Sequence, residues 1–198
     1  IFPAIVDVSR VNSINKYIFA NAAGAIAGMA GVSIPEELSL KPAIAITMFG
    51  QTKPVVDYCH SDLEEKGFEP LIFHATGLGG RIMEGLVEDS MIAGIIDVTT
   101  TEIADAIFDG VFSAGNTRLT AAGKKGIPHV VVPGCMDMVN FGSKDTILEK
   151  FRERQLYYSK PTVTLMRTNP DENWKIGKMV AENLRDANPE KTVVVLPL

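Results

Sequence analysis

The residues best suited to chemistry lie in a glycine-rich loop after a short apolar run. The segment Leu71 to Arg81 reads LIFHATGLGGR, so a strand at 71–73 is expected to enter the loop and a helix to begin at about Arg81. Such a loop places backbone N–H groups beside a helix N-terminus, where an anion binds well. The spacing G-x-G-G matches neither the dinucleotide fingerprint nor the Walker pattern, and a simple tight turn is the alternative. We predict that the loop binds a phosphate or carboxylate through Thr76, Gly77, Gly79 and Gly80.

A second polar group follows the next expected strand, at 94–98. It consists of Thr99, Thr100, Thr101 and Glu102. Three threonines in a row disfavour the change from strand to helix unless their hydroxyls make hydrogen bonds. We therefore predict that the group contacts a ligand, with helix capping by Thr101 as the alternative.

Two later loops carry groups of opposite charge. The segment GCMDMVNFG at 134–142 follows an expected strand at 129–132, and we predict ligand contacts there from Gly134 and Asn140. Asp137 stands among apolar neighbours and needs partners or water, so it is a candidate general base or cation ligand, or else caps a turn. Arg167 and Thr168 end an expected strand at 162–166, where a guanidinium can bind a phosphate or carboxylate with two hydrogen bonds. An internal salt bridge from Arg167 to Glu102 or Asp137 is the alternative.

Histidine and cysteine add one further candidate. His74 ends a strand beside the glycine loop and is a candidate acid or base, although a lone histidine also serves as a core group. His60 and His129 are expected to be structural. Cys59 and Cys135 have no CxxC spacing, and no metal site is predicted. Cys135 has no sequence neighbour that would activate it as a nucleophile.

The elements that must position these groups alternate along the chain. Near-continuous apolar strands alternate with amphipathic helices, which predicts a three-layer α/β fold with an open, mostly parallel sheet of about six strands and helices on both faces, Rossmann-like. Right-handed crossovers then bring the strand-to-helix loops to one edge. One domain over residues 1–198 is expected; residues 1–12 are a possible interdomain connector, and Ala4–Val8 is a possible seventh strand.

The N-terminal part of the chain predicts a helix of small residues. Apolar residues recur every three or four positions from Ser13, the expected N-cap, to Ala30. Its alanines and glycines allow close packing within the domain or against a second subunit, and we expect a homo-oligomer. Residues 17–35 carry no charge over 19 positions, but their Ala- and Gly-rich composition is weakly apolar, so no membrane span is expected.

Composition narrows the class of protein. The chain of 198 residues is 46% hydrophobic, with a net charge of −5. Nucleic acid is not expected as a partner, because its binding needs clustered Lys and Arg. The cysteine count fits a reducing cytoplasm. The chain begins at Ile1 rather than Met, so it is expected to be cut from a longer protein.

Five segments, taken in order, carry a resemblance that covers nearly the whole chain: DVSRVNSINKYIFANAAGAIAGM, HATGLGGRIMEGL, DVTTTEIAD, AGNTRLTAAGKKGIPHVVVPGCMDMVNFG and LMRTNPDENWKIGKMVAENL. Together they resemble the uncharacterised protein family that includes the plant tobamovirus-resistance protein. The resemblance implies that this chain is the C-terminal lobe of a two-lobe module, preceded by an ATP-binding lobe. It also implies a ligand in the cleft between the lobes. ATP is therefore expected in the intact protein, with no certain cofactor for this chain alone.

We expect this lobe to bind a phosphorylated or carboxylated small molecule at the carboxyl edge of its sheet, with the N-terminal ATP-binding lobe as its partner. Whether it catalyses a reaction stays open. The alternative is a protein–protein interaction module without catalysis, in which the loops merely end strands. In the plant relative, the resemblance implies a module that binds and inhibits a viral replication protein.

Overall fold

The computed structural model describes residues 11–33 and 41–196 of the chain. The chain divides into two units, residues 1–39 and 40–198, and each is described by itself. The possible strand at Ala4–Val8, and most of the possible connector at 1–12, lie outside the described residues. A single domain over the whole chain stays a prediction.

The first unit contains helix α1, Ser13–Ala30, as expected from its apolar periodicity. Its N-cap is Asn12, one residue before the N-cap that we predicted, Ser13. The Asn12 side chain accepts hydrogen bonds from the N–H groups of Ile14 and Asn15, at 2.9 and 3.0 Å. Within the described part of the chain, no helix is long and apolar enough to cross a membrane.

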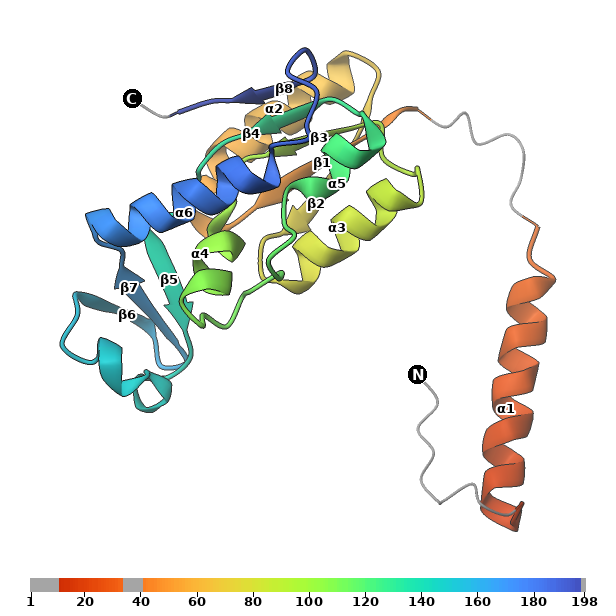
Figure 1. Cartoon of the computed structure of the whole chain (residues 1–198). Helices are drawn as coiled ribbons and strands as arrows, with labels where there is room; N and C mark the ends of the chain where they lie inside the picture. Colours follow the sequence, from red (N-terminus) through yellow and green to blue (C-terminus); the bar gives the residue numbers. More distant parts are fainter. Residues whose placement is uncertain (1–10, 34–40, 197–198) are drawn as a thin grey trace. The chain divides into compact units, whose positions relative to one another are not determined.

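The second unit is built on a parallel sheet of five strands (Figure 1). Its order is β2-β1-β3-β4-β8, and every neighbouring pair is parallel. This is the doubly wound order in which the chain reverses direction between β1 and β3, and ligands of such sheets bind at the carboxyl ends of those strands. The strands are β1 Ala43–Met48, β2 Glu69–His74, β3 Gly94–Asp97, β4 His129–Val131 and β8 Thr192–Val194.

Helices cover both faces of this sheet, as predicted. On one face, Ile46 packs in a cluster with Val56 of helix α2, Lys53–Glu65. On the other face, the neighbouring strand residue Ala45 packs with Met83 of helix α3, Leu78–Glu88, and with Ala121 and Ala122 of helix α5, Thr120–Lys125. Alternate strand residues therefore face opposite helix layers, which explains the near-continuous apolar runs.

A second, three-stranded antiparallel sheet, of order β5-β7-β6, corrects one prediction. The strand expected at 162–166 is β7, Val163–Arg167, and it belongs to this sheet and not to the parallel one. Strands β5, Met138–Phe141, and β6, Leu156–Lys160, were not predicted. An apolar run alone does not distinguish a parallel strand from an antiparallel one. Helices α4, Thr101–Ile107, and α6, Pro170–Asn183, pack with β5 and β7 in one apolar core (Figure 1).

The turn between β2 and α3 is tighter than we predicted. Helix α3 begins at Leu78, three residues before the expected start, and His74 is the last residue of β2. The turn needs close backbone approach: a Cβ atom at Gly79 would overlap the carbonyl oxygen of His74. Glycine is therefore required at position 79 by packing, independently of any ligand.

We predict that Gly79→Ala lowers the free energy of unfolding by about 1 to 3 kcal/mol, because the added methyl group must displace backbone. The matched control is Gly85→Ala in the same helix, where an added Cβ would find no heavy atom within 4 Å. This control should be neutral or stabilising by up to about 1 kcal/mol. Urea unfolding followed by circular dichroism measures both. Equal stabilities for the two variants would contradict the close approach.

Candidate functional site

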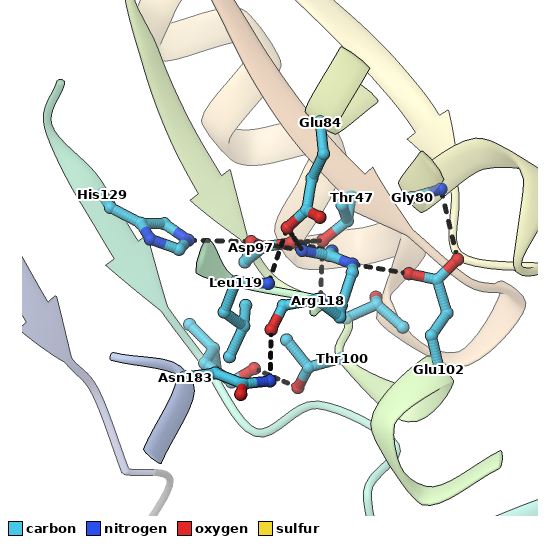
Figure 2. Close-up of polar contacts among 12 residues, drawn as sticks. Thr47, Gly80, Glu84, Asp97, Thr100, Glu102, Arg118, Leu119, His129 and Asn183 are labelled. Atoms are coloured by element: carbon cyan, nitrogen blue, oxygen red, sulfur yellow. Dashed lines mark hydrogen bonds and ion pairs between the residues drawn. The ribbon is translucent and has the colours of Figure 1, made fainter. Parts of the chain in front are cut away.

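A buried arginine lies at the centre of the polar interior, below the carboxyl edge of the sheet. The Arg118 side chain is fully buried, and three carboxylates point toward its guanidinium group (Figure 2). Its Nε donates to Glu102 at 2.8 Å, and its Nη1 lies 3.1 Å from Asp97 and 3.4 Å from Glu84. The second Nη atom also donates to Asp97. One cation thus joins strand β3 to helices α3 and α4.

Asp97, the last residue of β3, is the most strongly held of these carboxylates. It accepts hydrogen bonds from Arg118 and from Thr47 Oγ1 at 3.0 Å, and its Oδ2 lies 2.8 Å from His129 Nε2. Burial by itself would raise the pKa of Asp97, but the charge of Arg118 and the hydrogen bonds from His129 and Arg118 outweigh it and hold the pKa well below its usual range. Asp97 is therefore ionised at neutral pH. For Glu84, burial outweighs the attraction of Arg118 and raises the pKa.

The glycine loop already holds an anion that belongs to the protein. Glu102 Oε1 accepts hydrogen bonds from the N–H groups of Gly77, at 2.7 Å, and Gly80, at 3.2 Å. A Cβ atom at Gly80 would overlap this carboxylate. The anion at this helix N-terminus is an internal side chain, which Arg118 neutralises from its other side. Ligand binding by the glycine loop stays a prediction.

The predicted threonines are buried and use their polar groups internally. Thr99 Oγ1 lies 2.7 Å from Thr52 Oγ1, and Thr100 Oγ1 donates to the Val132 carbonyl at 3.0 Å. Thr101 Oγ1 accepts from Asn140 Nδ2 at 3.0 Å. Gly134 lies beside them, since its carbonyl accepts from the Thr100 N–H at 3.1 Å. Ligand binding by this buried set stays a prediction, because each hydroxyl already has a partner.

Asp105 forms a second buried carboxylate site, with Asn140. Its Oδ1 accepts from the backbone N–H of Asn140 at 2.8 Å, and its Oδ2 accepts from the N–H of Phe112 at 2.8 Å. Burial nevertheless raises the pKa of Asp105 to about 6, because these hydrogen bonds only partly replace its hydration. The contacts fix the loop before Phe112 against strand β5.

Two of the predicted residues, His74 and Thr76, line an open cleft. The cavity has a volume of about 500 Å³ and lies between the loops after β1 and β2 and the hairpin of β6 and β7. Its size is in the range of small-molecule sites. The residues around it are Phe49, Gly50, Gln51, His74, Thr76, Phe112, Ser159, Lys160, Val163 and Leu165.

Asp137 and Arg167 meet each other, away from this cavity. Arg167 Nη1 donates to Asp137 Oδ2 at 2.6 Å, and both side chains are more than half exposed. This is the internal salt bridge that we named as an alternative. Thr168 is buried, and its hydroxyl donates to Asn173 at 2.8 Å. Burial, and then the charge of Asp137, raises the pKa of Cys135 to about 11, which leaves the thiol protonated and weakly nucleophilic.

The sequence reasoning missed the charged centre of the site: Arg118, Asp97, Glu84 and Asp105. A signal was present for Asp97, because a carboxylate that ends the buried run GIID must have a partner. No comparable signal marks Arg118, which stands in a polar stretch of turns. Among the described residues, no group of three His, Cys, Asp or Glu side chains is arranged to hold a metal ion.

The strand order and the cleft at the carboxyl edge define this chain as a doubly wound α/β protein with an appended antiparallel sheet. Comparison with known proteins then gives the family. Residues 41–198 match the C-terminal domain of the uncharacterised protein family UPF0261, and the chain belongs to this family. The resemblance identified from the sequence is confirmed.

Relatives of the chain come from bacteria and plants. It is 47% identical over 195 residues to a UPF0261 protein of Clostridium tetani, which covers 98% of this chain and 48% of the relative. It is 40% identical over 208 residues to the ToMV resistance protein Tm-1(GCR237) of Solanum lycopersicum, covering 99% of this chain and 28% of the relative. The chain therefore spans less than half the length of these curated relatives.

We predict that Asp97→Asn costs most stability at neutral pH and progressively less in acid. The depressed pKa of Asp97 stabilises the fold above the usual carboxyl pKa, near pH 4, and this stabilisation is lost as the pH falls toward the folded-state value. The difference in unfolding free energy between wild type and variant should shrink by roughly 1.4 kcal/mol per pH unit below about pH 4.

Urea unfolding at pH 7, 4 and 3 measures this difference. The control is Asp186→Asn, which changes an exposed carboxylate and should show no such trend. If the difference in unfolding free energy between wild type and Asp97→Asn is constant over this pH range, Arg118 does not lower the pKa of Asp97 in the folded protein.

Proposed function

We propose that this chain is the C-terminal lobe of a two-lobe ATP-binding protein and that it holds a phosphorylated or carboxylated small molecule at the carboxyl edge of its parallel sheet. ATP would bind the other lobe, and any reaction would need both lobes closed on the ligand. A cytoplasmic location fits this proposal, since both cysteines are free. We also expect a homo-oligomer.

The observation that carries the proposal is the position of the cleft. It is lined by Phe49, Gly50 and Gln51 after β1 and by His74 and Thr76 at the end of β2. Strand β1 stands where the strand order reverses, which is the usual ligand position in a doubly wound sheet. The N-terminus of helix α2 follows the first of these loops, and its dipole favours an anion there.

The buried charges support the cleft from below. The Glu102 carboxylate fixes the loop by accepting hydrogen bonds from the N–H groups of Gly77 and Gly80, and Arg118 in turn fixes Glu102. Thr76 and His74 are thus presented by a rigid turn, which is the arrangement that orders ligand contacts in advance. His74 remains the candidate acid or base, because it is exposed and borders the cavity.

We predict that His74→Ala and Thr76→Val reduce or abolish the thermal stabilisation that small anions give to the intact two-lobe protein. The measurement is differential scanning fluorimetry with ATP present and with a panel of phosphate monoesters and short carboxylates. Arg167→Ala is the control, because its exposed ion pair lies outside the cavity, and it should leave the ligand-dependent shift unchanged. If both cavity variants keep the full ligand-dependent increase in melting temperature, the binding site lies elsewhere.

A protein–protein interaction module is the second candidate, favoured by the free edge of the parallel sheet. Among the described residues, strand β8 pairs with β4 alone, and Val193 and Val194 of this strand and Val195 and Leu196 after it are exposed. Such an apolar edge strand can pair with another chain. If this function is correct, Val193→Lys weakens partner binding, whereas His74→Ala leaves it unchanged.

A further inference from the structure

The cleft combines apolar side chains with a single positive charge, and this combination favours some small anions over others. Phe49, Phe112, Val163 and Leu165 give it an apolar side. The two phenyl rings meet edge to face, with centroids 6.0 Å apart and planes at 68°. This arrangement presents a fixed hydrocarbon surface, against which a flat or branched apolar group packs well.

The hairpin of β6 and β7 also brings one positive charge to the cleft, beside Val163, which pairs with Lys160. Lys160, at the end of β6, is the only lysine or arginine among the described residues around the cavity, and no aspartate or glutamate is among them. Three other cations of this region pair with carboxylates: Lys150 with Asp109, Arg154 with Glu172 and Arg167 with Asp137. Lys144 and Arg152 border a different cavity. In the described part of the chain, Lys160 makes no ion pair.

A β-bulge turns this part of the hairpin toward the cavity. The register of β6 against β7 shifts between Tyr158 and Lys160, so Ser159 is the extra residue. In a regular strand, Ser159 and Lys160 would point to opposite faces of the sheet. Here both line the same cavity, and bulges commonly redirect side chains beside binding sites.

From these observations we infer that the ligand is a monoanionic carboxylate with an aromatic or branched hydrocarbon body. This inference rests on the proposed function and narrows it. The carboxylate binds Lys160, with Ser159, Thr76 or Gln51 in position to hydrogen-bond its oxygens, and the hydrocarbon packs on Phe49 and Phe112. One lysine neutralises a single charge, whereas a phosphate dianion is usually bound by several cationic or N–H donors.

The test compares four probes that separate the contribution of the charge from that of the apolar residues. Phenylacetate carries both the ring and the carboxylate, acetate carries the charge alone, 2-phenylethanol carries the ring alone, and phenyl phosphate carries the ring with a doubly charged group. Binding is measured by titration calorimetry with the intact two-lobe protein and with this chain. NMR signals of the ring protons of the three histidines give an independent readout of position.

The expected result is saturable binding of phenylacetate, tighter than that of the other three probes, with a shift of the His74 signal and none for His60. Lys160→Ala should weaken phenylacetate binding about tenfold, and Lys160→Arg should restore most of it. The matched control is Lys144→Ala, which removes an exposed lysine that borders a different cavity, beside Tyr158. It should not change the affinity. Phe112→Ala should weaken the binding of phenylacetate but not that of acetate.

Three results would overturn the inference in distinguishable ways. If phenyl phosphate binds more tightly than phenylacetate and shifts His74, the ligand class is wrong although the site of the proposed function stands. If no probe binds and no small anion shifts the His74 signal, the proposed function fails together with the inference. Equal loss of affinity in Lys160→Ala and Lys144→Ala would show a general effect of charge and would also overturn it.

Discussion

The fold of residues 40–198 depends on the burial of one guanidinium group among three carboxylates. Removing Arg118 and its partners from water costs several kcal/mol per ion, and their mutual attraction offsets this only with good geometry. The geometry is good because each carboxylate comes from a different element: Asp97 from β3, Glu84 from α3 and Glu102 from α4. The packing of these elements and the pairing of the charges therefore require each other, and loss of one charged partner leaves the others buried and uncompensated.

This interior also fills the anion position of the glycine loop. A glycine loop at a helix N-terminus is normally open to an anion, but here Glu102 takes the position. The ligand position that we propose therefore lies farther out, at the rim where His74 and Thr76 meet the hairpin of the small sheet. The buried polar groups act as a frame for that rim, in the way that outer-shell residues orient direct contacts in other sites.

The sequence was sufficient for the parts of the fold that are set by local pattern. Alternating apolar strands and amphipathic helices predicted the α/β class and helices on both faces, and the apolar periodicity predicted helix α1 with its N-cap one residue too late. It was insufficient for the second sheet, because Met138–Phe141 lies within a run of Gly, Asp and Asn that resembles a loop. The pairing of this strand with β7 is a contact between distant parts of the chain, which local pattern does not reveal. The contacts of Arg118 depend on residues 16 to 34 positions away, which no local spacing reveals.

The β-bulge of strand β6 has a consequence for how this family can diversify. The cavity wall that it shapes belongs to the small sheet, whose edge strand takes no part in the ion pairs of Arg118. Substitutions at Ser159 and Lys160 therefore act almost independently of the stability of the parallel sheet. The proposed ligand contacts at this edge strand could therefore change without loss of the scaffold that carries them.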